Sequence, residues 1–182
     1  MLSDEQIIKR VLKGHAEEFR VLMQRHQAAV FMLAYRFFGR REDAEDIVQE
    51  TFLRVYQSLS SLRQSEKLWP WVRRIALNTC LKRVTPEIPS DEVEQLIDCL
   101  PDETIEVEAE VLRHLDSEDI HLAIAGLTME YRAIVVMRYM EDLSCVEISE
   151  LLNKPASTVR VQLHRALKML SKRLAVIKNE MH

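Results

Sequence analysis

The chain contains few of the residues that interrupt helices. Glycine occurs three times and proline five times in 182 residues, whereas proteins built from β-strands use both residue types in their many turns. Alanine, leucine, glutamate, lysine and arginine, which favour the helical conformation, are abundant. The composition therefore predicts an all-α protein.

Two further absences concern the location of the chain. No run of about 18 apolar residues is present, so the sequence predicts no membrane-spanning helix. The first five residues, Met-Leu-Ser-Asp-Glu, lack the basic start of a secretory signal peptide. We therefore expect a cytoplasmic protein without direct membrane insertion.

The sequence also lacks the patterns that catalysis or metal binding requires. Cys80, Cys99 and Cys145 are odd in number and show no Cys-x-x-Cys spacing, which argues against a disulfide framework and a structural zinc site. His15 and His26 have no second ligand type at metal spacing and are interpreted as ordinary surface or interface histidines. No carboxylate pair, Ser-His-Asp set or phosphate-binding loop occurs. We expect no catalytic residue, no metal and no cofactor.

The formal net charge of −4 hides a segregation of charge along the chain. Residues 85–120 contain thirteen acidic residues and one basic residue, while the rest of the chain contains 16 acidic and 24 basic residues. A basic protein with an acidic insert is what a polyanion-binding protein would show. Pro86, Pro89 and Pro101 lie in the acidic segment, and with the like charges they predict a linker with at most one short helix.

The first part of the chain predicts two helices. Ser3 and Gln6 predict a capping box for a helix that ends at Gly14. A longer helix is expected from about Ala16 to Phe38, with Gly39 after its end. Its expected core residues, at helical spacing, are Phe19, Leu22, Met23, Val30, Phe31, Leu33, Ala34 and Phe37.

Residues 43–57 predict an amphipathic helix with an unusual polar face. Its apolar face consists of Ala44, Ile47, Val48, Thr51, Phe52, Val55 and Leu59. Leu53 breaks this pattern because it falls within the polar face, surrounded by Asp46, Gln49, Glu50 and Gln57. A leucine among acidic and amide side chains indicates a docking surface, although single exposed leucines are also common without such a role.

A second candidate site follows a polar loop at residues 60–67. Pro70 predicts the start of a helix with Trp71 in the core. Six basic residues and one acidic residue occur from Arg63 to Arg83. The outer side of the helix carries Arg73, Arg74, Asn78, Lys82 and Arg83. A charge run is usually only a solvated face, but solvated faces tend to mix charges of both signs, and this one does not.

The C-terminal part of the chain has helix-turn-helix spacing. Ser144 and Glu147 predict a capping box. Asn153 can adopt the left-handed conformation of a tight turn, and Pro155 can open the next helix, which is expected to reach about residue 177. Inward positions of that helix are Val159, Leu163, Ala166, Leu167 and Leu170, and outer or flanking positions are Ser157, Thr158, Arg160, Gln162, His164, Arg165, Lys168, Lys172 and Arg173. Such a face suits a recognition helix in the major groove of DNA, where basic side chains contact phosphates and an arginine or glutamine reads base edges.

The motif AEDIVQETFLRVY at residues 44–56 resembles the helix by which bacterial sigma factors of the extracytoplasmic-function group, in the sigma-70 family, bind the coiled coil of the largest RNA polymerase subunit. The basic segment at residues 63–83 resembles the part of that family that opens the promoter −10 element. Residues 127–174 resemble its −35-binding domain. The resemblance implies an N-terminal helical bundle and a C-terminal helix-turn-helix domain joined by the acidic linker.

The resemblance also implies roles for individual residues. Residues 1–84 would bind core polymerase and −10 DNA, residues 85–104 would form the linker, and residues 105–182 would bind −35 DNA. The residues implied for polymerase binding are Asp46, Gln49, Glu50 and Leu53. Those implied for −10 DNA are Arg63, Lys67, Arg73, Arg74, Asn78 and Lys82, and those for −35 DNA are Ser157, Thr158, Arg160, Gln162, His164, Arg165 and Lys168. Lys154 stands where the family usually has an apolar residue, and it could reach a phosphate.

The implied function is that of an alternative sigma factor. Such a protein binds core RNA polymerase, directs it to promoter DNA through −10 and −35 recognition, assists promoter melting, and is held in check by an anti-sigma factor. A dimeric helix-turn-helix regulator, whose N-terminal half senses a signal, is the alternative from another class. A dimer would protect a palindrome without polymerase, whereas a sigma factor requires polymerase and two unlike DNA elements.

Overall fold

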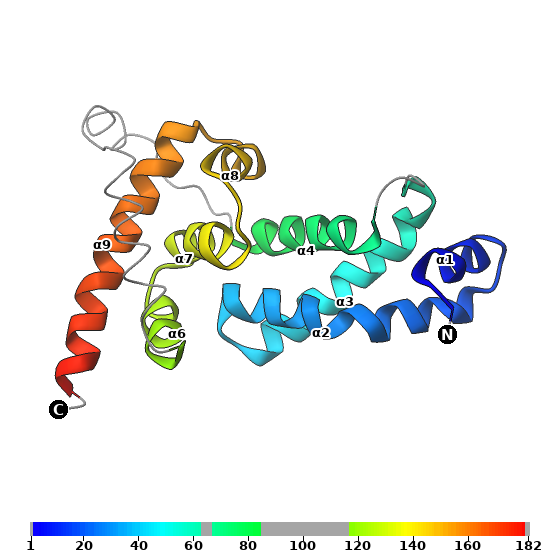
Figure 1. The fold of residues 1–182 in the computed structure, drawn as a ribbon, viewed down its shortest axis with the longest axis horizontal. Helices are drawn as coiled ribbons and strands as arrows, with labels where there is room; N and C mark the ends of the chain where they lie inside the picture. The colour runs from blue at the N-terminus through cyan, green and yellow to red at the C-terminus, as the bar shows by residue number, and fades with distance from the viewer. Residues whose placement is uncertain (1, 63–66, 85–116, 181–182) are drawn as a thin grey trace. The chain divides into compact units, whose positions relative to one another are not determined.

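The computed structural model describes residues 2–62, 67–84 and 117–180, and every regular element in these ranges is a helix (Figure 1). The chain forms two compact units, unit 1 at Met1–Arg83 and unit 2 at Val84–His182, and each is described by itself. The predicted all-α class is confirmed. The predicted linker at residues 85–104, Arg63 and Cys99 lie outside the described residues.

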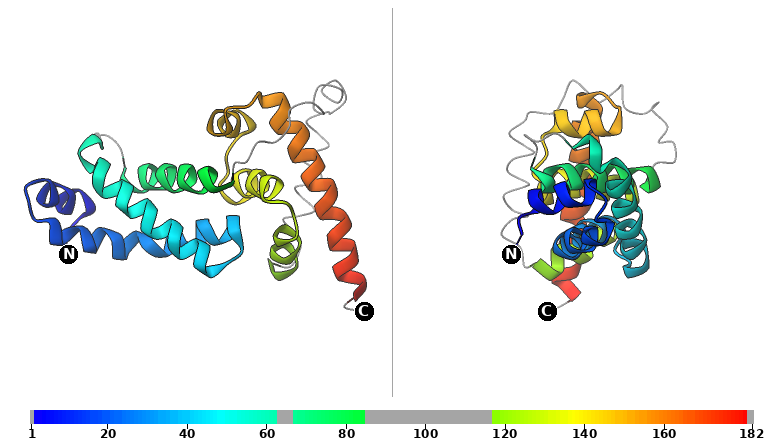
Figure 2. Two further views of the ribbon diagram at one scale, coloured as in Figure 1. Left: turned by 180° about the vertical axis from the view of Figure 1, so that it is seen from behind. Right: turned by 90° about the vertical axis from the view of Figure 1, so that its right-hand side faces the viewer.

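The described residues of unit 1 form four α-helices and two short 3-10 turns. The helices are α1 (Asp4–Leu12), α2 (Phe19–Phe38), α3 (Arg41–Ser58) and α4 (Leu68–Val84). The 3-10 turns, Ala16–Glu18 and Leu59–Ser61, lie where the sequence predicted the start of the second helix and part of the polar loop. Helices α2 and α3 pack against each other along their lengths (Figure 2).

Local side-chain chemistry fixes the ends of these helices as predicted. The Ser3 hydroxyl accepts from the Gln6 backbone N–H at 3.2 Å, and the Gln6 amide oxygen accepts from the Ser3 backbone N–H at 2.9 Å. Gly39 ends α2 with φ +69°, and its N–H donates to the Tyr35 carbonyl at 2.7 Å. Glycine adopts this left-handed conformation without steric strain, which explains the sharp end of α2.

The core of unit 1 lies between α2, α3 and α4. The predicted apolar face of α3 is buried except for Val48, which is half-buried. Trp71 is buried as predicted, and Val72, Ala76 and Cys80 of α4 are buried with it. Because these residues hold one side of each helix against its neighbours, the opposite sides of α3 and α4 face away from this core.

Unit 2 contains α6 (Ser117–Ala125), α7 (Met129–Val135), α8 (Cys145–Leu152) and α9 (Ala156–Glu180). The Ser144 and Glu147 capping box is confirmed, and Asn153 has φ +51° in the turn between α8 and α9. The five predicted inward residues of α9 are all buried. Helix α7 continues as a π-helical turn, Val136–Met140, after which the Glu141 N–H donates to the Val136 carbonyl at 3.0 Å.

Arg132 of α7 holds the end of α6. Its Nε donates to the Ile124 carbonyl at 3.2 Å, and its Nη2 donates to the carbonyls of Leu127, at 3.2 Å, and Ala125. Carbonyls in the last turn of a helix have no partner within the helix, so one guanidinium satisfies several of them. Burial lowers the pKa of Arg132 from its usual range.

We expect Arg132→Met to destabilise unit 2 by about 2 kcal/mol, because it removes the guanidinium donor from the carbonyls of Ala125 and Leu127, at and just after the end of α6. Urea unfolding followed by helical circular dichroism measures this loss. Lys172→Met, which removes one positive charge from an exposed position of α9, is the control and should change stability little. Equal losses for the two variants would contradict the role given to Arg132.

Candidate functional site

The four residues implied for polymerase binding lie together on the outward side of α3. Asp46, Gln49, Glu50 and Leu53 occupy consecutive turns opposite the buried face, and we call them the docking surface. Leu53 is 57% exposed, which confirms that this leucine is not part of the core. Its neighbours supply negative charge and one amide, so the surface offers apolar contact surrounded by hydrogen-bond acceptors.

Both acidic residues of the docking surface have arginine partners within unit 1. Glu50 Oε1 accepts from Arg54 Nη2 at 2.6 Å and from Arg54 Nε at 3.1 Å. Asp46 Oδ2 lies 3.5 Å from both terminal nitrogens of Arg83, at the end of α4. Exposed ion pairs of this kind contribute less than about 1 kcal/mol, so a basic partner can displace either arginine.

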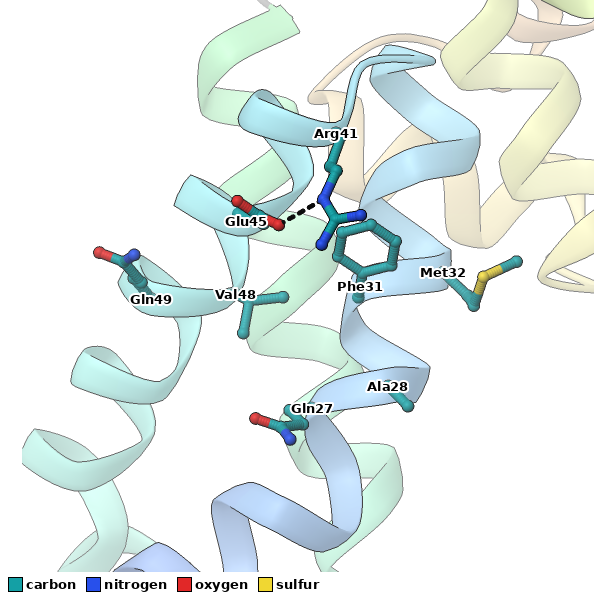
Figure 3. Close-up of a pocket in the computed structure, with 8 residues that line it drawn as sticks. All are labelled: Gln27, Ala28, Phe31, Met32, Arg41, Glu45, Val48 and Gln49. Atoms are coloured by element: carbon teal, nitrogen blue, oxygen red, sulfur yellow. Dashed lines mark hydrogen bonds and ion pairs between the residues drawn. The ribbon is translucent and has the colours of Figure 1, made fainter.

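A hollow of about 510 Å³ lies beside the docking surface (Figure 3). It is lined by Gln27, Ala28, Phe31 and Met32 of α2 and by Arg41, Glu45, Val48 and Gln49 of α3. Arg41 Nε donates to Glu45 Oε1 at 2.7 Å at its edge. The sequence pattern placed Phe31 in the core, but its ring is half-buried and faces this hollow.

The residues expected to contact −10 DNA lie on the side of α4 away from the core. Lys67, Arg74, Asn78 and Lys82 are exposed and Arg73 is half-buried; we call these five the basic face. Arg63 lies outside the described residues. Leu77 and Thr79 are buried on either side of Asn78, and the Thr79 hydroxyl donates to the Ile75 carbonyl at 2.8 Å. The amide of Asn78 is therefore the outward group of this turn.

Helix α9 presents most of the residues expected to contact −35 DNA. Arg160 and Lys168 are exposed, and Ser157, Thr158, His164 and Arg165 are half-buried. We call these six residues the recognition face. The turn before them is closed by the Lys154 N–H, which donates to the Ser149 carbonyl at 3.0 Å.

Gln162, which was expected at an outer or flanking position of α9, lies at the edge of its buried face. Its side chain is only 4% exposed, and its Oε1 has no hydrogen-bond partner among the described residues. At about 100° per residue, Gln162 lies roughly 60° around the helix from Val159, which is buried, so it borders the core stripe. In this conformation the amide of Gln162 does not reach a base edge.

Lys154 is also less available than the sequence suggested. Its side chain is half-buried in the turn between α8 and α9. Burial lowers the pKa of Lys154, while the negative charge of Glu130 in α7 opposes this shift. A phosphate would have to compete with Glu130 for this lysine.

Within residues 2–62, 67–84 and 117–180, no helix is both long and apolar enough to cross a membrane. In the same ranges, no three side chains of histidine, cysteine, aspartate or glutamate come together as metal ligands.

Comparisons with known proteins match both units. The family model of sigma-70 region 2 matches residues 22–86, and that of sigma-70 region 4 matches residues 117–170. The ECF RNA polymerase sigma factor SigW of Bacillus subtilis is 31% identical over 177 residues, which cover 92% of this chain and 94% of that protein. The ECF RNA polymerase sigma-E factor of Haemophilus influenzae is 28% identical over 187 residues, which cover 95% of this chain and 96% of that protein.

Solved structures share the fold. The sigma factor RpoE of Bartonella quintana, in complex with the anti-sigma factor NepR, has a TM-score of 0.55 at 16% identity and covers 88% of this chain and 98% of its own. CnrH, in complex with the cytosolic domain of CnrY, has a TM-score of 0.53 at 20% identity, and the match covers 93% of this chain and 96% of CnrH. The chain matches SigW over nearly the whole length of both proteins, and it matches the two family models. It therefore belongs to the extracytoplasmic-function sigma factors of the sigma-70 family.

Proposed function

We propose that this sigma factor divides its work between three surfaces. The docking surface binds core RNA polymerase, the basic face contacts and opens the −10 element, and the recognition face contacts the −35 element. The observation that carries the proposal is the exposure of Leu53 among acidic and amide residues, on a helix whose opposite face is buried. The two surfaces of unit 1 lie within the match to sigma-70 region 2 and the third lies within the match to region 4.

Docking combines one apolar contact with an exchange of ion partners. Burial of Leu53 against an apolar patch of polymerase removes its side chain from water, which favours binding. Asp46 and Glu50 exchange Arg83 and Arg54 for basic residues of polymerase, so negative charge is paired before and after binding. The charges therefore contribute mainly to the orientation and speed of docking, and Leu53 contributes mainly to affinity.

Opening of the −10 element needs favourable contacts that exist only with separated strands. Taking a base out of the stack costs a few kcal/mol. Lys67, Arg74 and Lys82 attract the phosphates of the strand, and the Asn78 side chain offers both a donor and an acceptor to a base or sugar. Arg74, Asn78 and Lys82 lie on one side of α4, which holds them in fixed register, and Lys67 directly precedes the helix.

Binding of the −35 element uses the recognition face. Arg160 and Lys168 are exposed and suit phosphate contacts. Arg165 lies five residues after Arg160 and can reach a base edge, where its guanidinium suits the two acceptors of guanine. Ser157 and Thr158 lie in the first turn of α9, and their hydroxyls can bind a phosphate near the helix start.

Regulation and location follow from the same family membership. The Bartonella quintana structure contains an anti-sigma factor, and we infer that an anti-sigma factor also holds this chain in check by covering its polymerase-binding surface. The protein acts in the cytoplasm, where the polymerase is, and catalyses no reaction itself.

Run-off transcription tests the proposed function directly. Purified core polymerase plus this protein, supplied with a genomic DNA library, should produce defined transcripts, and their start sites should share unlike −35 and −10 elements. Core polymerase alone is the control. Protection of a palindrome by this protein without polymerase, with no transcript, would favour the dimeric regulator instead.

We expect Asn78→Ala to reduce promoter opening more than polymerase recruitment. The variant lacks the amide that contacts the separated strand, while the charges that attract duplex DNA remain. Permanganate reactivity of thymines in the −10 region measures opening, and gel shift of holoenzyme measures recruitment. Gln24→Ala, which removes an exposed amide from α2, is the matched control. Equal reactivity in wild type and Asn78→Ala would contradict the assignment.

A further inference from the structure

A polar cluster joins the start of α1 to the middle of α2. Asp4 is the first residue of α1, where a negative charge is favoured by the helix dipole. Its Oδ1 lies 2.5 Å from Arg25 Nη1, and its Oδ2 accepts from His26 Nε2 at 2.8 Å. Arg25 Nη2 also donates to the Leu2 carbonyl at 2.8 Å. Two adjacent residues of α2 thus hold both oxygens of one carboxylate.

The cluster is more sheltered than an ordinary surface ion pair. The side chains are 18% exposed for His26, 26% for Arg25 and 30% for Asp4. Burial raises the pKa of the Asp4 carboxyl, but the hydrogen bonds from His26 and Arg25 and their charges outweigh this effect and hold the pKa below its usual range. The carboxylate is therefore charged at neutral pH and remains an acceptor for His26.

His26 has a second contact on the other side of its ring. The imidazole stacks on the indole of Trp69, with ring centroids 6.0 Å apart and planes at 11°. Trp69 is the second residue of α4, two residues after Lys67 in sequence and one helical turn before Arg73. The bond to Asp4 helps to orient the imidazole, and the stack itself holds the first turn of α4 against α2.

We propose that His26 is a positioning residue for promoter opening: bonded to Asp4, its ring stacks on Trp69 and fixes the first turn of α4, and with it Lys67 and Arg73 of the basic face. The inference rests on the proposed role of that face. His26 does not contact DNA in this account. It holds Lys67 and Arg73, which contact the DNA, in the positions that contact with separated strands requires.

Two substitutions of His26 separate the stack from the hydrogen bond. His26→Gln keeps a donor that can reach Asp4 and removes the aromatic ring, whereas His26→Phe keeps the ring and removes the donor. The free energy that an aromatic pair of this kind contributes changes an equilibrium constant by about threefold to tenfold. We therefore expect His26→Gln to reduce the open fraction of holoenzyme complexes on a duplex promoter by that factor, and His26→Phe to reduce it by less than about twofold.

A promoter with a premelted −10 bubble supplies the readout that distinguishes positioning from general stability. On that template opening is already done, so His26→Gln should initiate as well as wild type and should bind core polymerase equally. Trp69→Leu breaks the same stack from α4 without touching Asp4 or Arg25, and should reproduce the loss on duplex DNA alone. It provides the test if the His26 variants do not fold.

Three results would overturn the inference. They are wild-type opening by His26→Gln and Trp69→Leu on duplex DNA, an equal loss on duplex and premelted templates, and a loss for His26→Phe as large as that for His26→Gln. Failure of the wild-type protein to initiate on either template with core polymerase is a different result. That outcome would refute the proposed function and would be visible before any variant is compared.

Discussion

Replacing Leu53 with alanine is expected to weaken binding to core polymerase by roughly tenfold, and replacing Asp46 as well by a further twofold to fivefold. The larger effect belongs to Leu53 because its side chain is exposed in the free protein and would lose water on docking. The smaller effect belongs to Asp46 because it exchanges one ion partner for another. Titration of labelled core polymerase with each variant measures both.

The control for this prediction is Leu12→Ala. Leu12 is 53% exposed at the end of α1, close to the value for Leu53, and lies outside the docking surface. Both alanine variants should keep the helical circular dichroism and melting temperature near those of wild type. Broad unfolding of Leu53→Ala, with normal affinity per folded molecule, would show that Leu53 stabilises unit 1 and does not dock.

Substitutions at Arg165 and Lys172 are expected to differ in kind on the −35 element. Arg165→Ala should lose on the order of 1–3 kcal/mol on the correct sequence and relax discrimination at one base pair. Lys172 lies seven residues further along α9, roughly 10 Å at 1.5 Å per residue, where the helix approaches the DNA backbone. Lys172→Ala should therefore weaken all sequences alike and lower the salt dependence by about one charge.

Binding of holoenzyme to matched and mismatched −35 duplexes at several salt concentrations measures both effects. Holoenzyme is used because it contains the full chain in its working form. Losses for both variants that do not depend on sequence would mean that Arg165 contacts only phosphate. In that case the reading of bases would pass to Arg160 or His164, since Gln162 is buried.

The helix ends and helix faces could be predicted because they depend on residues a few positions apart. Ser3 with Gln6 and Ser144 with Glu147 form capping boxes through contacts three residues apart. The conformation of Asn153 depends on its own short side chain. The exposure of Leu53 followed from helical periodicity alone, because the apolar face of α3 lies on the other side.

The contacts that sequence periodicity missed join residues far apart in the chain. His26 was taken as an ordinary histidine, since neither Asp4 nor Trp69 is near it in the sequence. The burial of Gln162, which was expected at an outer or flanking position, was also missed, because periodicity gives its angle around α9 and not how far the neighbouring core extends. The hollow beside the docking surface likewise depends on how α2 lies against α3, which no single helix specifies.

The contact between Asp46 and Arg83 makes the two proposed partners of unit 1 thermodynamically linked. While Asp46 holds Arg83, one positive charge at the end of α4 is partly neutralised. A polymerase residue that captures Asp46 releases Arg83 toward DNA, and DNA that captures Arg83 leaves Asp46 open to polymerase. Linkage requires each partner to raise the affinity for the other by the same factor, which the strength of an exposed pair limits to about fivefold. A single weak ion pair would thus favour the complex that contains both polymerase and DNA over a complex with either partner alone.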